Sequence, residues 1–214
     1  NILHTAASRV AALDLGFLPV NGGRDVAAIV DGAQKGEIDF IYLLGADEFD
    51  VAHLGRAFVV YQGSHGDAGA HHADVILPGA AYTEKDGLYI NFEGRAQRGR
   101  RAVFPPGDAK EDWAIVRALS EVLGAKLPYD NHAALMMALE KDVTHFAALG
   151  PAPVHADTRP ATWEGIGMAG ALDSAPVAHA ISDFYLTNPI ARASETMARC
   201  SREFVTGANK LAAE

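Results

Sequence analysis

Three short apolar runs stand in the first part of the chain, at residues 39–45, 57–61 and 73–78. Each run is continuous rather than alternating, which is typical of strands buried on both faces of a parallel sheet. Segments with helical spacing of apolar residues lie before and between the runs. Because strands that alternate with helices imply right-handed crossovers, the sequence predicts an α/β fold with a doubly wound, mostly parallel sheet.

Helical spacing of apolar residues also marks the regions around this sheet. It predicts helices at residues 1–15, at 108–123 and at 131–149. Asp25 can cap a further helix, since its carboxylate can accept hydrogen bonds from the first turn. Between the third apolar run and the helix at 108–123, residues 82–103 are polar and show no regular period.

Residues 150–188 are rich in proline and glycine and have no sustained period. Structureless loops longer than about 15 residues are uncommon inside a compact domain. The segment nevertheless keeps large apolar residues, among them Trp163, Phe184 and Tyr185, which a simple solvated linker would lack. We therefore expect an extended arm that lies on another protein surface.

A helix is expected after this arm, with Asn188 as its cap and Pro189 at its first position. The chain thus divides into four predicted portions: an α/β portion at 1–104, a helical portion at 105–149, the extended arm at 150–188 and a C-terminal helix at 189–214.

The composition limits the classes of function. A net charge of −9 argues against nucleic acid as a partner. No apolar run reaches the roughly 18 residues that a membrane span needs, so direct membrane insertion is not expected. The single cysteine, Cys200, excludes an intramolecular disulfide and any four-thiolate cluster made by this chain alone. Because the sequence begins with Asn1 rather than Met, we expect a processed or partial chain.

A glycine-bearing loop, residues 62–72, follows the second apolar run. Such loops at the carboxyl end of a strand can bind phosphate, but the glycine spacing here is GxxGxxG and Asp67 would repel an anion. A structural turn is the favoured alternative. His65, Asp67, His71 and His72 could form a zinc set, yet the adjacent histidines point to different sides of any helix or strand. We expect polar loop residues and no metal site.

Catalytic side chains are not predicted. Glu84, Asp86 and Glu93 could serve as paired carboxylates in acid–base chemistry, but ion pairs with Lys85 and Arg95 explain them more simply. The candidate nucleophiles lack an adjacent base in a recognisable motif; these are Ser8, Ser64 and Cys200.

One basic cluster stands out on this acidic chain: Arg95, Arg98, Arg100 and Arg101. It could clamp an anionic ligand or dock an acidic face of a partner. The alternative is a solvated strand edge kept from aggregating by its charge, and both interpretations stay open. The candidate partner contacts are these four arginines together with Trp163, Phe184 and Tyr185.

Several motifs resemble known families. Ala73–Pro78 (ADVILP), Tyr82–Gly87, Asn91–Arg95 and Gln97 resemble a signature of the molybdopterin oxidoreductases. Tyr61–Asp67 and the tail, Asp183–Ser194 with Met197–Cys200, are similar to one branch of that superfamily, the C-terminal region of the large iron–sulfur subunit of NADH:quinone oxidoreductase.

This resemblance implies a molybdoenzyme-like fold without the molybdenum cofactor, acting as a non-catalytic scaffold in a proton-translocating oxidoreductase. It places iron–sulfur clusters (2Fe–2S and 4Fe–4S) in the amino-terminal part of the full subunit and no cofactor in this segment. The implied partners are other peripheral-arm subunits of respiratory complex I, including the rest of the large iron–sulfur subunit. The implied location is the cytoplasmic face of the bacterial inner membrane or, in a eukaryote, the matrix side of the mitochondrial inner membrane.

The resemblance also implies a role for the sheet's carboxyl edge. In catalytic relatives that edge faces the pterin, whereas here Glu93 and Arg95 could pair with each other or close the cleft. Two other functions stay open. A fragment of an active molybdopterin oxidoreductase, similar to formate dehydrogenase, would bind pterin and molybdenum. A stand-alone α/β module would be monomeric and bind nucleotides, although the apolar arm favours a partner surface.

Overall fold

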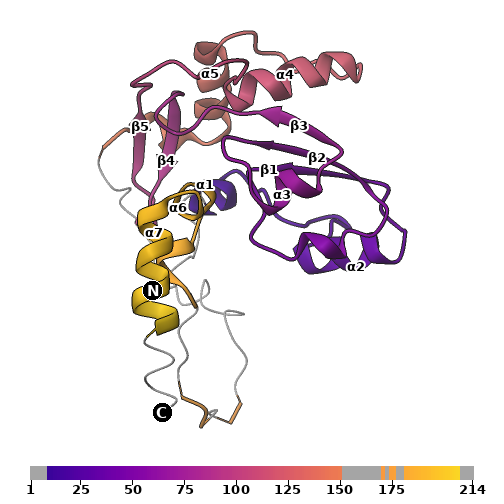
Figure 1. Cartoon of the computed structure of the whole chain (residues 1–214). Helices are drawn as coiled ribbons and strands as arrows, with labels where there is room; N and C mark the ends of the chain where they lie inside the picture. The colour runs from indigo at the N-terminus through magenta and orange to yellow at the C-terminus, as the bar shows by residue number, and fades with distance from the viewer. Residues whose placement is uncertain (1–8, 151–169, 172–173, 177–180, 208–214) are drawn as a thin grey trace.

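The computed structural model describes residues 9–150, 170–171, 174–176 and 181–207. Within these ranges the chain forms a mixed α/β structure with a parallel sheet, a separate antiparallel hairpin and several helices (Figure 1). Among them, no helix is both long and apolar enough to cross a membrane.

The parallel sheet has three strands in the order β1 (Phe40–Leu44), β2 (Phe58–Gly63) and β3 (Val75–Pro78). Its register pairs Phe40 with Phe58 and Val60 with Val75. The three predicted strands and their parallel direction are therefore confirmed.

Figure 1 shows α2 (Val26–Gln34) and α3 (Ala68–His72) on one face of the sheet, and the short 3-10 helix η1 (Val51–His53) packs with them. Asp25 caps α2 as expected, because its carboxylate accepts a hydrogen bond of 2.8 Å from the backbone N–H of Ala28. The core on this face consists of Ile41, Leu43, Val59 and Tyr61 from the strands, with Ala33 and Ala70 from the covering helices and Leu54 directly after η1.

The opposite face of the sheet is largely open. Val59 to Gln62 of β2 are buried, but Phe40, Leu44 and Phe58 are 55%, 53% and 47% exposed, and Val75 of β3 is exposed as well. The expectation that all three strands are buried on both faces is therefore wrong for β1 and β3. The physical reason is that α2, η1 and α3 all pack on one side of the sheet.

An antiparallel hairpin of β4 (Gly87–Ile90) and β5 (Ala96–Gly99) occupies the region that lacked a period in the sequence. It packs against α1 (Arg9–Asp14) and against two helical segments, α5 (His132–Asp142) and η2 (Thr144–Ala147). The second core has Ile90, Ala96 and Phe146 at its centre.

Helix α4 (Asp112–Val122) begins later than its apolar spacing suggested. Lys110 forms an isolated parallel bridge with Gly79 beyond the end of β3, so the backbone before α4 is extended rather than helical. The helix expected at 131–149 likewise ends at Asp142 and is followed by the 3-10 turn η2.

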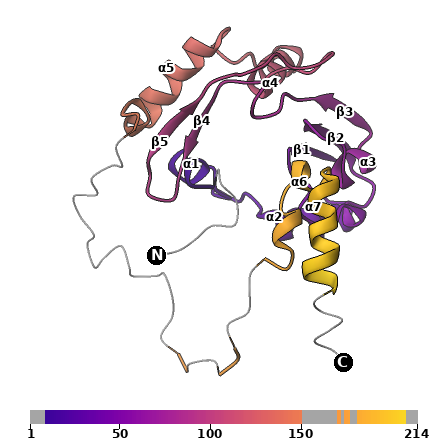
Figure 2. The ribbon, with the colours of Figure 1, turned by 60° about the vertical axis from the view of Figure 1, so that its left-hand side comes forward.

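The C-terminal segment contains η4 (Phe184–Leu186), α6 (Pro189–Arg192), α7 (Glu195–Cys200) and a π-helical turn, η5 (Ser201–Thr206). Asn188 caps α6 with a hydrogen bond of 2.9 Å from the N–H of Ala191, and Pro189 opens the helix as predicted. Ser194 then caps α7, so two short helices replace the single predicted one. Figure 2 shows α6 and α7 beside the parallel sheet.

The domain boundaries at residues 104, 149 and 188 stay predictions. Most of the predicted arm, including Trp163, lies outside the described residues.

Candidate functional site at the carboxyl edge of the sheet

Parallel strands β1 and β2 end at the same edge of the sheet, which is where folds of this class bind ligands. Gly45, with φ of 58°, turns the chain away after β1. Helix α6 lies against this edge, and a hollow of about 230 Å³ separates it from the strands. The hollow is lined by Gly45, Tyr61, Gly63, Ser64 and His65 on one side and by Asn188, Pro189 and Ile190 on the other.

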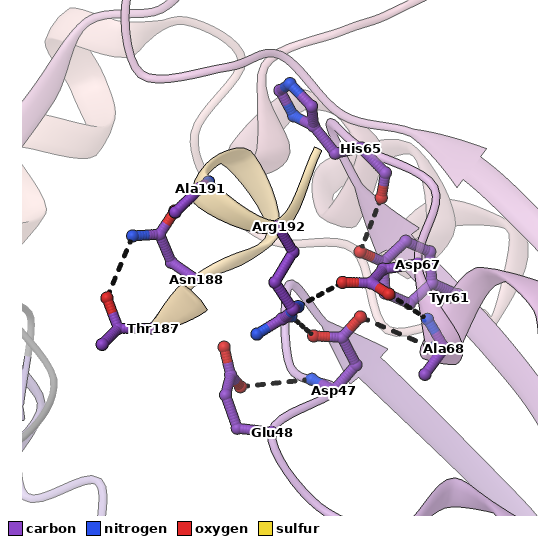
Figure 3. A network of polar contacts seen from close by, with 11 residues as sticks. Asp47, Glu48, Tyr61, His65, Asp67, Ala68, Thr187, Asn188, Ala191 and Arg192 are labelled. Atoms are coloured by element: carbon purple, nitrogen blue, oxygen red, sulfur yellow. Dashed lines mark hydrogen bonds and ion pairs between the residues drawn. The ribbon is translucent and has the colours of Figure 1, made fainter. Parts of the chain in front are cut away.

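At this edge a guanidinium joins two carboxylates (Figure 3). The Arg192 Nη2 atom of α6 lies 2.5 Å from Asp47 Oδ1, and Arg192 Nε donates a hydrogen bond to Asp67 Oδ2. We call Asp47, Asp67 and Arg192 the Arg192 cluster. The side chain of Asp47 is fully buried, while those of Arg192 and Asp67 are 23% and 28% exposed. The cluster therefore connects the C-terminal segment to the loops that follow β1 and β2.

Local structure holds both carboxylates in place. Asp67 is the N-cap of α3 and accepts a hydrogen bond of 2.9 Å from the N–H of Ala68. Asp47 accepts a longer one, 3.5 Å, from the N–H of Gly69. The hydroxyl of Tyr61 donates to the backbone carbonyl of His65 at 3.1 Å, which ties the loop back to β2.

The pKa values of the two carboxyl groups are shifted in opposite directions. Burial raises the pKa of Asp47 above its ordinary value, although the Arg192 guanidinium and the Gly69 N–H both oppose this shift. The hydrogen bond from Arg192 lowers the pKa of Asp67. Burial, followed by the charge of Asp47, raises the pKa of the Tyr61 hydroxyl. These shifts follow from one buried and one partly exposed carboxylate sharing a single cation.

A second polar network crosses the open face of the sheet. The hydroxyl of Tyr42 donates to Gln62 Oε1, and Gln62 Nε2 donates to Asp112 Oδ1 at 2.8 Å. Asp112, at the start of α4, also forms an ion pair with Lys85. Gln62 is completely buried where α4 meets the sheet, and these two hydrogen bonds satisfy both the oxygen and the nitrogen of its amide. Lys85 and Asp112 also line a wider cavity of about 620 Å³ between the sheet edge, the hairpin and α5.

The acidic residues suggested for acid–base chemistry have structural contacts. Glu84 accepts a hydrogen bond from the N–H of Ala81 at 2.9 Å, and Asp86 accepts one from the N–H of Arg101 at 3.1 Å. Glu93 lies 3.9 Å from Arg95, as the sequence suggested. Lys85 pairs with Asp112 instead of with its acidic neighbours in sequence.

The predicted basic cluster lies on and beside β5. Arg95 donates to the carbonyl of Gly150 at 2.8 Å, and Arg98 pairs with Glu140 of α5 at 3.4 Å. Arg101 pairs with Glu111 at 3.6 Å and lies over the ring of Phe104, 4.5 Å from its centroid. Arg100 is exposed. Intramolecular pairs thus hold three of the four arginines, and their role as partner contacts stays a prediction.

The other candidate contacts lie on the C-terminal segment. Phe184 is exposed and meets Tyr185 edge-on, with ring centroids 5.6 Å apart. The ring centroid of Tyr185 in turn lies 6.2 Å from that of Phe204. The three rings form one aromatic group at the surface, and its contact with a partner also stays a prediction.

The histidine-bearing loop does not gather metal ligands. Asp67 pairs with Arg192, and Nδ1 of His65 lies 3.0 Å from the Ser64 hydroxyl. Over the described part of the chain, no group of three or more His, Cys, Asp or Glu side chains is placed to hold a metal ion.

Sequence reasoning singled out Asp67 but missed its partners. Arg192 is 125 residues from Asp67 and 145 from Asp47, and no local pattern relates such positions. The one available signal was the Asn188-Pro189 cap, which correctly placed a helix start three residues before Arg192.

A pterin cofactor with its phosphate group, which the resemblance implies for catalytic relatives, does not fit this edge. A phosphate would face the carboxylates of Asp47 and Asp67, and the cation that could neutralise it is already bound to both. We therefore derive no chemical step through such a cofactor.

Comparison with known proteins agrees with the fold. A family model described as molybdopterin oxidoreductase matches residues 1–122, and one described as the C-terminal part of the NADH-ubiquinone oxidoreductase G subunit matches residues 160–200. The chain is 46% identical to the mitochondrial 78 kDa subunit of NADH-ubiquinone oxidoreductase from Candida albicans, over 95% of this chain and 28% of that protein.

Two further relatives are similar to the same degree. Identity is 44% to the 75 kDa subunit from Reclinomonas americana, over 94% of this chain, and 44% to the mitochondrial 78 kDa subunit from Neurospora crassa, over 97%. The chain spans 28% and 27% of their lengths. Since the molybdopterin oxidoreductase model covers more than half of its residues, the chain belongs to the molybdopterin oxidoreductase family.

Proposed function

We propose that this chain is a scaffold segment of the large iron–sulfur subunit of an NADH:quinone oxidoreductase, and that it supports electron transfer from NADH to quinone without binding a redox centre itself. The observation that carries the proposal is the identity of 44–46% to such subunits over at least 94% of the chain. The two family models match in the order expected of one continuous subunit.

The residues of the chain support a non-catalytic role for it. Its single cysteine, Cys200, cannot supply the four thiolates that a cubane or binuclear cluster needs. At the carboxyl edge, where catalysis would need open binding groups, Asp47 and Asp67 are engaged by Arg192. The 2Fe–2S and 4Fe–4S clusters of the subunit would therefore be held by other parts of its polypeptide.

The proposed partners are the rest of the same subunit and other peripheral-arm subunits of complex I. The segment would lie on the cytoplasmic face of a bacterial inner membrane or on the matrix side of the mitochondrial membrane. Of the candidate contact residues that the structure describes, Phe184 and Arg100 are exposed to solvent and would suit such contacts.

Affinity purification of the tagged full-length subunit tests this proposal. We expect subunits that carry flavin and iron–sulfur clusters to co-purify with it, and molybdenum and pterin to be far below one equivalent per subunit. Stoichiometric molybdenum and pterin would support the alternative of an active molybdopterin oxidoreductase. A monomer that binds nucleotides and carries no associated subunits would instead indicate a stand-alone ligand-binding module.

A further inference from the structure

We propose that Asp47 and Asp67 form a guanidinium-binding site whose occupant is Arg192, so that the chain's own C-terminal segment is docked over the ligand-binding edge of the sheet. This inference goes beyond the scaffold role and stands on geometry alone. It concerns how the segment is held, and it would survive if the chain proved to act in a different complex.

The geometry of the site matches a guanidinium. Two carboxylates from separate loops approach two different nitrogens, Nη2 facing Asp47 and Nε facing Asp67 (Figure 3). A planar group with several fixed donors can satisfy both carboxylates at once, whereas an ammonium is a single point charge on a flexible stem. The site is therefore selective for arginine over lysine.

The charge balance makes the site depend on its occupant. Without Arg192, the fully buried carboxylate of Asp47 would face Asp67 and Glu48, and no second cation among the described residues acts on it. An unpaired buried charge is strongly destabilising, so the loops after β1 and β2 would have to open or take up a proton. The docking of α6 is thus coupled to the ordered conformation of the loops after β1 and β2.

Docking also determines what covers the strand ends. Arg192 fixes α6, and the first residues of that helix, Pro189 and Ile190, form one wall of the hollow over Gly63 and Tyr61. A nucleotide or pterin phosphate that approached this edge would have to displace α6 and then meet two carboxylates. The C-terminal segment therefore covers and cross-links the strand ends at the place where related folds bind a ligand.

Hydrogen exchange in the assembled complex tests the proposal. The full-length subunit is compared as wild type and as Arg192→Ala, with exchange rates measured for peptides that cover α3 and α6. We expect amide exchange in both helices to rise by about tenfold or more, because a buried ion pair is broken. Arg199→Ala is the matched control, since Arg199 is an exposed arginine on the next helix, and it should leave these rates unchanged.

Chemical rescue distinguishes a guanidinium site from a general loss of packing. Ethylguanidinium added to the Arg192→Ala complex should restore at least part of the protection of α3, whereas ethylammonium at the same concentration should not. Should Arg192→Ala prevent assembly, Arg192→Lys and Asp67→Asn keep the site testable, because the first keeps the positive charge without the guanidinium donors and the second removes one of the two carboxylate charges. Both should raise exchange in α3 and α6 by a smaller factor.

The proposal would be overturned if Arg192→Ala and Arg199→Ala raised exchange equally. It would also be overturned if ethylguanidinium and ethylammonium restored the protection of α3 equally. Neither result would bear on complex membership, which the co-purification experiment decides separately.

Discussion

Gly69 allows helix α3 to lie directly against the ring of Tyr61. A Cβ atom at this position would lie 2.8 Å from Tyr61 Cδ2 and 3.0 Å from the Cβ of Asp47, closer than side chains pack. The same backbone N–H reaches Asp47. At the scale of single residues, a missing side chain therefore brings α3 close enough for its loop to take part in the Arg192 cluster.

Replacing Gly69 with alanine should push α3 away from Tyr61 and weaken the cluster. We expect a cost of about 1–3 kcal/mol in the local opening free energy of α3, as for other overpacked sites. Native-state hydrogen exchange of the full-length subunit measures this change in opening free energy. Gly66→Ala is the control, because a Cβ there meets no atom within 4 Å. Equal effects of the two substitutions would show that the close approach to Tyr61 is unimportant.

The Arg192→Ala variant should lose less stability at low pH than at high pH. In the wild type the lowered pKa of Asp67 gives stability that is present above its ordinary value of 3.8 and is lost as pH falls through the lower folded value. Burial raises the pKa of Asp47, and removing the guanidinium raises it further, so the ionised carboxylate penalises the variant until a proton binds. Both effects act in the same direction.

The charged and titratable groups around these carboxylates are Arg192, Glu48, Tyr61 and His71. We expect a loss of about 3 kcal/mol in opening free energy near pH 8, at the lower end of the range for buried pairs because Arg192 is partly exposed. The loss should shrink as the pH is lowered toward 3.8, the ordinary value of these carboxyl groups, and below it. A difference between variant and wild type that stayed constant over this range would contradict the assigned ionisation of Asp47.

Helix α6 is only four residues long, so its cap and its ion pairs must hold it together. Asn188 accepts from the N–H of Ala191, and Arg192 stands at the other end of the helix. Substitution Asn188→Ala should cost about 1 kcal/mol and raise exchange in α6. Asn188→Ser retains a capping oxygen and should recover most of this loss. Equal loss in the two variants would mean that the cap does not stabilise α6.

Elements could be predicted where their own residues determine them. The three strands are continuous apolar runs, and the caps Asp25 and Asn188 bond within their own first turns. The hairpin was missed because β4 and β5 have four residues each and carry polar or glycine positions. Its core is completed by residues from distant segments of the chain, among them Phe146 and Val10. Local patterns contain no information about such contacts.

At the scale of the whole molecule, one face of the sheet is only partly covered by the described residues, because α4 meets it at Gln62 but leaves the rest exposed. Phe40 and Phe58 stack on this face with ring centroids 6.3 Å apart, and Leu44 and Val75 are exposed beside them. Parallel sheets are normally covered on both faces. The chain corresponds to only 27–28% of the length of its relatives. We therefore expect the rest of the same polypeptide to cover this face in the full-length subunit.

Photocrosslinking identifies what covers the open face. With p-benzoylphenylalanine in place of Phe40 in the full-length subunit, crosslinks in the assembled complex should map to segments of that same polypeptide outside these residues. The same probe at Phe92, an exposed phenylalanine at the turn of the hairpin, controls for nonspecific capture. Crosslinks from position 40 to a different subunit would place an intersubunit interface on the sheet. Crosslinks to no protein would mean that two stacked aromatic rings face solvent, which their apolar area makes unfavourable.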